Sequence, residues 1–169
     1  SEFDELRRDP SQEGPEFVVF HTLIQHDPFI VSPDGGDLTV PADVDHTSRA
    51  GMDYYLQQLQ YVQRQILETV DQILADSATP PVILIQADEG FEVDAEVFGE
   101  EAAEDIRVKG IGAFYLPGLG DPGVPSPPNT VNALHYVFNE YFGTDYPMLD
   151  SVTHRESEPP FDFEEIPVR

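Results

Sequence analysis

The sequence predicts an α/β fold with a mainly parallel sheet, because two apolar segments flank a long helical pattern. Residues 16–24 (EFVVFHTLI) are rich in Val and Phe and lie between Gly-Pro and Asp-Pro pairs, which is typical of a buried strand. Residues 82–86 (VILIQ) form a continuous apolar run that suits a strand covered on both faces. Strand, helix and strand in this order indicate a parallel βαβ unit.

A helix is predicted between these strands, over about residues 49–76. Thr47 or Ser48 can cap its start, and the pair Pro80-Pro81 prevents its continuation. The apolar residues that recur every three or four positions on one face are Met52, Tyr55, Leu56, Leu59, Val62, Ile66, Val70, Ile73 and Leu74.

The second half of the chain predicts a surface loop with a short helix over residues 91–109, followed by a third strand at 110–116. A second amphipathic helix is expected to begin at Asn129 or Thr130 and to end at Gly143. The tail after this helix is predicted to be loop-like, because Pro159 and Pro160 interrupt it.

Composition limits the function classes. The chain has 169 residues, with 33 Asp and Glu against 8 Lys and Arg, so its formal net charge is −25. Such a surface repels phosphate backbones and anionic lipids, which excludes nucleic-acid partners and favours metal ions or cationic partners. The absence of Cys excludes disulfides and thiolate sites. With Lys109 as the only lysine, the acidity indicates either a salt-adapted surface or ordinary solubilising charge.

The segment Asp88-Glu89-Gly90 directly follows the second predicted strand, where ligands bind in open α/β sheets. A carboxylate of Asp88 can ligate a divalent metal, Glu89 can add a second oxygen, and Gly90 permits a sharp turn. The alternative is that Asp88 caps a short turn and Glu89 is solvated, and spacing alone favours this alternative.

Two histidines flank the end of the first predicted strand. His26 precedes a loop, where a neutral imidazole can bind a metal or a ring N–H can meet an anionic oxygen. His21 is interpreted as a partly buried histidine within the strand, and His135 as a rim residue of the second helix. The acidic run from Glu100 to Asp105 lacks the ligand spacing of an EF-hand loop and is interpreted as a solvated face.

Five strings in order resemble the C-terminal half of the sulfatase-like branch of the alkaline phosphatase superfamily, which includes lipoteichoic acid synthase. They are FVVFHTLIQHDPF, YYLQQLQYVQRQIL, PPVILIQADEG, AFYLPG and SPPNTVNALHYVFNEYFGTDYPML, and they span roughly residues 15 to 150. The resemblance implies a three-layer α/β arrangement with a mainly parallel sheet, as in the C-terminal portion of an alkaline-phosphatase-like domain.

The resemblance also implies a metal-dependent hydrolase of phosphate or sulfate esters, or a phosphoglycerol-type transferase. Asp88 is then a metal ligand, and His26 contacts the anionic oxygens of the ester substrate. Glu89 stands where relatives mostly place a metal-binding His, so the divalent metal shifts from Zn²⁺ toward Mn²⁺, Mg²⁺ or Ca²⁺, or the site is lost. The alternative function is a non-catalytic, degenerate binding or structural module with a salt-adapted acidic surface.

The family's nucleophile lies in an N-terminal half that this sequence does not contain. We therefore expect no catalytic nucleophile here, a lead-in at 1–15, the C-terminal portion of the domain at 16–150 and an acidic tail at 151–169. The chain is expected to be soluble, inactive alone and partnered by the missing half, with a homodimer as an alternative. The resemblance places the parent protein at the extracellular face of a membrane.

Overall fold

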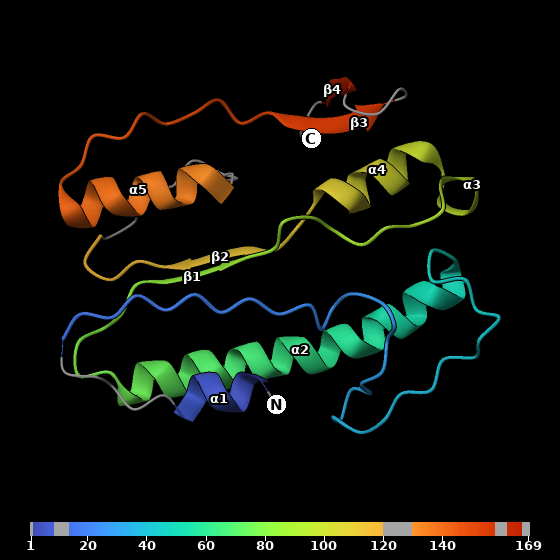
Figure 1. Cartoon of the computed structure of the whole chain (residues 1–169), viewed down its shortest axis with the longest axis horizontal. Helices are drawn as coiled ribbons and strands as arrows, with labels where there is room; N and C mark the ends of the chain where they lie inside the picture. The colour runs from blue at the N-terminus through green and yellow to red at the C-terminus, as the bar shows by residue number, and fades with distance from the viewer. Residues whose placement is uncertain (1, 9–13, 120–129, 158–161, 167–169) are drawn as a thin grey trace. The chain divides into compact units, whose positions relative to one another are not determined.

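The computed structural model describes residues 2–8, 14–119, 130–157 and 162–166 (Figure 1). The chain forms two compact units, Ser1–Pro80 and Pro81–Arg169. Each unit has its own helices and hydrogen bonds, and each is considered by itself below.

The first unit is built on α2 (Arg49–Asp76), which confirms the predicted 28-residue helix. Ser48 is its N-cap, because the Ser48 hydroxyl accepts a hydrogen bond from Gly51 N at 3.1 Å. At the other end Ser77 N donates to Ile73 O at 3.1 Å, which satisfies one of the last carbonyls. The short helix α1 (Glu2–Arg8) packs against α2 (Figure 1).

The buried stripe of α2 is more polar than the sequence pattern predicts. Of the predicted apolar face, Val62 is fully buried, whereas Leu56 is 42% exposed. The buried positions on α2 are Gly51, Gln58, Val62, Gln65 and Thr69.

Polar side chains join α1 to this stripe. Arg7 of α1 donates to Thr69 Oγ1 at 3.1 Å and to Gln65 Oε1 at 2.9 Å, and its side chain is 14% exposed. Phe3 adds an apolar contact, with its ring 5.2 Å from that of Phe20. The buried stripe of α2 is polar because its Gln65 and Thr69 side chains accept hydrogen bonds from Arg7 of α1.

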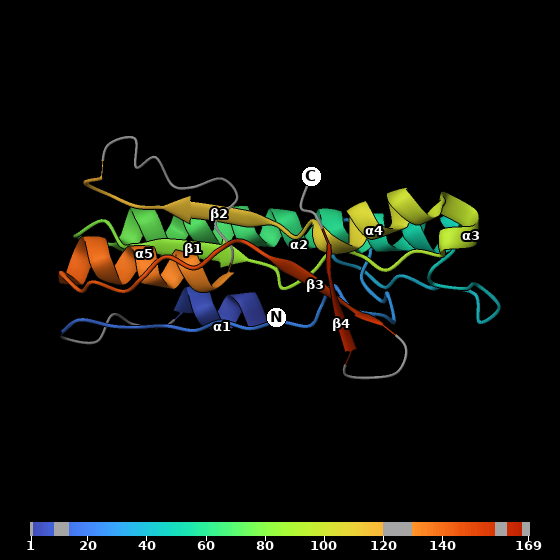
Figure 2. The same ribbon diagram turned by 90° about the horizontal axis from the view of Figure 1, so that it is seen from above.

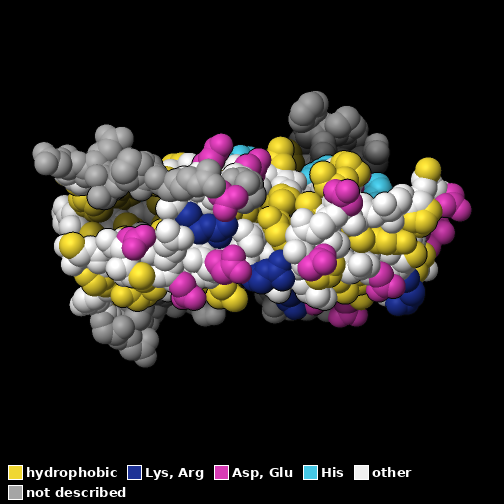
Figure 3. Space-filling model, turned by 90° about the horizontal axis from the view of Figure 1, so that it is seen from below, with side chains coloured by type: hydrophobic (Ala, Val, Ile, Leu, Met, Phe, Trp, Pro, Cys, Tyr) yellow, Lys and Arg dark blue, Asp and Glu magenta, His cyan; other side chains and the backbone are white. Residues whose placement is uncertain are grey.

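Residues 16–24 do not form the predicted strand. None of the described residues pairs with this segment in a backbone ladder, and Phe17, Val19 and Leu23 are 79%, 76% and 70% exposed. His21 is exposed as well, so its interpretation as a partly buried strand histidine is wrong. Figure 3 shows one face on which exposed hydrophobic side chains lie among acidic and scattered basic ones.

The second unit contains β1 (Ile83–Gln86) and β2 (Gly112–Tyr115), both inside segments that the sequence predicts as strands. The two strands pair antiparallel, with Ile83 opposite Tyr115 and Gln86 opposite Gly112. The chain between them forms α3 (Ala95–Phe98) and α4 (Glu100–Val108), where the sequence predicts a loop and a short helix.

The predicted three-layer α/β arrangement with a mainly parallel sheet is therefore wrong. Within the described ranges the strands form two separate two-stranded sheets, both antiparallel. The physical reason is that a parallel βαβ unit needs a first strand, and residues 16–24 provide none. The apolar run at 82–86 instead meets β2, the next strand along the chain.

The last part of the chain holds α5 (Thr130–Phe142) and a hairpin of β3 (Thr153–Ser157) with β4 (Asp162–Ile166). Gly143 has φ of 67°, the left-handed conformation expected at a helix C′ position. Thr130 is the first helical residue, and the other predicted cap, Asn129, lies outside the described residues. The hairpin occupies part of the tail that the sequence predicts as a loop.

No helix within the described part of the chain is both long and apolar enough to cross a lipid bilayer.

Candidate functional site

The predicted metal-binding segment forms a turn after β1, which we call the strand-end turn and define as residues 87–92. Ala87 N donates to Ile111 O at 2.9 Å, and Gly90 N donates to Arg107 O at 2.7 Å. The turn is thereby held against the chain that precedes β2 and against the last turn of α4. A Cβ on Gly90 would lie 1.8 Å from Ile106 O, so close packing against α4 requires glycine here.

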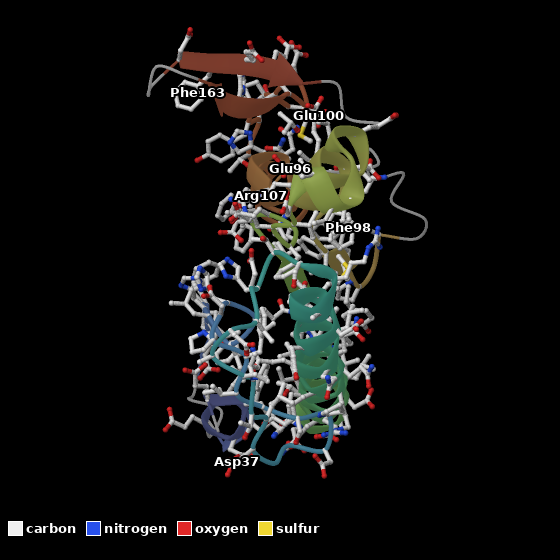
Figure 4. The ribbon with its side chains drawn as sticks, turned by 90° about the vertical axis from the view of Figure 1, so that its right-hand side faces the viewer. Asp37, Glu96, Phe98, Glu100, Arg107 and Phe163 are labelled. Carbon is white, nitrogen blue, oxygen red and sulfur yellow. The ribbon has the colours of Figure 1, made fainter. Side chains whose placement is uncertain are left out.

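Asp88 and Glu89 have different partners within this turn. Asp88 Oδ1 accepts a hydrogen bond from Glu89 N at 3.0 Å, so this carboxylate caps its own turn. Glu89 Oε2 lies 2.9 Å from Arg107 Nη2, and the same guanidinium donates to Glu92 Oε2 at 3.1 Å. Figure 4 shows Arg107 near the end of α4, with Glu100 at its start.

Arg107 is a residue of this site that sequence reasoning missed. It is 18 positions away from Glu89, and the short helix predicted within 91–109 had no bounds that would place Arg107 in its last turn, where the structure has it. Its side chain is 43% exposed, so each ion pair contributes about 0–1 kcal/mol of stability. Its chemical effect is to balance the charge of Glu89.

These residues do not form a complete metal site. No group of three or more His, Asp or Glu side chains is arranged to hold a metal anywhere in the described ranges. Mn²⁺, Mg²⁺ and Ca²⁺ take about six or more ligands, and the strand-end turn offers the Asp88 carboxylate beside a Glu89 that already pairs with Arg107. The metal roles of Asp88 and Glu89 remain predictions.

A surface hollow of about 580 Å³ lies against α3 and α4. Phe98 and Val108 contribute apolar side chains to its lining, and the acidic residues that line it are Glu100, Glu101, Glu104 and Asp105. Asp105 forms an ion pair with Lys109 at 2.6 Å. Among the described residues, no three of these acidic side chains are grouped so that they could hold a metal ion.

The other predicted site residue, His26, lies in a loop of the first unit, which we call the His26 loop and define as residues 24–31. His26 N donates to Leu23 O at 2.9 Å, and the next peptide bond, Asp27-Pro28, is cis. Phe29 anchors the loop on α2, because it is only 3% exposed and its ring meets that of Tyr55 edge-on at 6.0 Å.

The imidazole of His26 projects from this anchored loop and is 75% exposed. Its Nδ1 lies 2.8 Å from Asp27 Oδ1 and 3.0 Å from Asp27 O. Both partners are oxygens that accept hydrogen bonds, so Nδ1 carries the proton. Nε2 is then the nitrogen that meets a ligand: it donates to an anionic oxygen when the ring is charged and accepts or binds a metal when the ring is neutral.

His135, expected at the helix rim, helps α5 hold the chain that follows it. Its ring stacks on Tyr146 at 5.2 Å, and its Nδ1 bonds Pro147 O at 2.8 Å. Asn139 accepts from Tyr146 N at 2.7 Å and donates to Tyr146 O at 2.8 Å, and Asn132 does the same for Leu149. Figures 1 and 2 show this segment running back along α5.

His26 belongs to the first unit, whereas Asp88 and Glu89 belong to the second.

Comparison with family models, with curated proteins and with solved structures found no match for this chain. The sulfatase-like resemblance therefore remains a prediction from sequence motifs.

Proposed function

We propose that the chain is part of a metal-dependent hydrolase of phosphoric or sulfuric esters, or of a phosphoglycerol-type transferase. The observation that carries this proposal is the ordered set of sulfatase-like motifs, one of which places Asp88 directly after a strand. Because the described strands pair antiparallel, the sheets lend no support to the proposal. It rests on these motifs and on the turns that carry them.

In this proposal His26 contacts the anionic oxygens of the ester. Support comes from the exposure of its ring and from Asp27, which engages Nδ1 and leaves Nε2 for the substrate. When the ring is protonated, Nε2–H is free to donate to an anionic oxygen of the ester. Asp88 is assigned to the metal because its carboxylate is exposed and the hydrogen bond that it accepts comes from within its own turn.

The catalytic nucleophile is assigned to an N-terminal half of the same domain, in a longer protein that faces outward from a membrane. The exposed apolar residues Phe17 and Val19 suit contact with such a half. A homodimer of the chain is the alternative partner, and light scattering of the 169-residue chain distinguishes the two by its mass.

The test is turnover of p-nitrophenyl phosphate and p-nitrophenyl sulfate, with Mn²⁺, by the longer protein. Asp88→Asn is expected to lose about 100-fold or more in rate, because a metal ligand matters at least as much as its outer partners. Glu92→Gln is the matched control, since it changes a carboxylate of the same turn that pairs with Arg107. Equal rates for wild type and Asp88→Asn contradict the role of Asp88.

The second candidate is a non-catalytic module of the same family. The Glu89–Arg107 ion pair favours it, because a guanidinium stands beside the carboxylate that a metal would need. Calorimetry of the longer protein with Mn²⁺, Mg²⁺, Ca²⁺ and Zn²⁺ separates the candidates. Heat of binding supports the enzyme, whereas no binding of any of the four supports the module.

A further inference from the structure

Gln58 links both ends of the His26 loop to α2. Its Oε1 accepts hydrogen bonds from Ile30 N at 2.8 Å and from Val31 N at 3.0 Å. Its Nε2 donates to Ile24 O, at the other end of the loop. The amide of one side chain thereby bonds backbone groups on both sides of His26.

The burial of Gln58 makes these bonds consequential. Its side chain is 1% exposed, and a buried amide that loses its partners carries a desolvation cost. The loop has few backbone bonds of its own: His26 N bonds Leu23 O, and Ile30 O accepts from Leu38 N at 2.9 Å. Gln58 therefore contributes a large share of the bonds that fix where the loop begins and ends.

We propose that Gln58 is a positioning residue for His26. It holds the loop in one conformation, and that conformation fixes where the imidazole presents Nε2. This inference rests on the proposed function, in which His26 contacts the oxygens of an anionic ester. When the loop samples other conformations, the apparent affinity for an anion falls in proportion to the fraction that remains competent.

The chain offers a matched control on the same helix. Gln65 is also buried, at 8% exposed, but it bonds Arg7 and Glu68 and has no bond to the His26 loop. Gln58→Leu and Gln65→Leu therefore remove the same amide from the same helix face. Only the first removes the bonds to Ile24, Ile30 and Val31.

The experiment is NMR on the whole chain, with backbone relaxation of residues 24–31 and titration of the His26 ring signal with inorganic phosphate. Gln58→Leu is expected to raise loop mobility and to weaken the phosphate response of His26 by about 10-fold. Gln65→Leu is expected to leave both unchanged. The inference is overturned if the loop is as ordered in Gln58→Leu as in wild type, or if both variants loosen it equally.

Gln58→Glu provides a second variant if Gln58→Leu does not fold. A neutral carboxylic acid keeps the acceptor and supplies an O–H donor to Ile24 O, whereas the ionised form has no donor. Loop order is thus expected to be high at low pH and to fall as the acid ionises. Loop order that does not change with pH overturns the inference. If wild-type His26 gives no phosphate response, its proposed role in contacting the ester fails, and loop order still decides the role of Gln58.

Discussion

Gly90→Ala is a substitution for which the structure predicts a large local effect in the second unit. A Cβ at this position would meet Ile106 O at 1.8 Å, where real Cβ atoms essentially never approach within 3.0 Å. The obstructing atom belongs to the backbone of α4, so no side-chain rotation relieves the clash. Overpacking costs about 1–3 kcal/mol, and loss of the bond from Gly90 N to Arg107 O adds about 1 kcal/mol, so we expect about 2–4 kcal/mol of destabilisation.

The assay is urea unfolding of the whole chain, with amide exchange of the second unit to localise the change. Gly112→Ala is the matched control, because its Cβ would meet nothing closer than Phe114 Cε2 at 3.9 Å. That control is expected to be neutral or slightly stabilising, since Ala restricts the unfolded chain. If Gly90→Ala is as stable as Gly112→Ala, the close packing of the strand-end turn on α4 is refuted.

Three further changes probe other contacts. The backbone N–H and the hydroxyl of Thr47 donate to the Asp45 carboxylate and hold the pKa of Asp45 below 3.8. The stability that these bonds give the fold is therefore present above pH 3.8 and is lost as the pH falls through the lower pKa of the folded state. An NMR titration of the Asp45 carboxyl with a midpoint at or above 3.8 contradicts this. Arg107→Met breaks exposed pairs with both Glu89 and Glu92 and should cost less than about 2 kcal/mol in urea unfolding, and a loss above about 3 kcal/mol contradicts that estimate. Asn139→Leu removes the side-chain acceptor of Tyr146 N, so hydrogen exchange at the Tyr146 amide should rise about 10-fold. Unchanged exchange refutes the role of Asn139 in holding this segment on α5.

The sequence predicts the helices better than the pairing of the strands. The long apolar period and the Ser48 cap specify α2 from local information alone. The run VILIQ also specifies a strand at β1, but an apolar run carries no information about its partner or direction. Residues 16–24 look like a strand by composition, although none of the described residues pairs with them.

For the candidate site too, the sequence predicts the local features and not the contacts between distant residues. The turn at Asp88 follows from a strand that ends beside a glycine, and the turn-capping alternative describes the hydrogen bond that Asp88 makes. Arg107 and Gln58 were not predictable, because each contacts residues 18 or more positions away. Such contacts depend on how α2 packs within the first unit and how α4 packs within the second, which a local pattern does not encode.

The most direct measurement is the rate of p-nitrophenyl ester hydrolysis by the longer protein, with Mn²⁺, for wild type, Asp88→Asn and Glu92→Gln. Hydrolysis is expected in wild type and Glu92→Gln and is expected to fall by about 100-fold or more in Asp88→Asn. A wild-type protein without measurable turnover of either ester, or an Asp88→Asn variant as active as wild type, would contradict the proposed function.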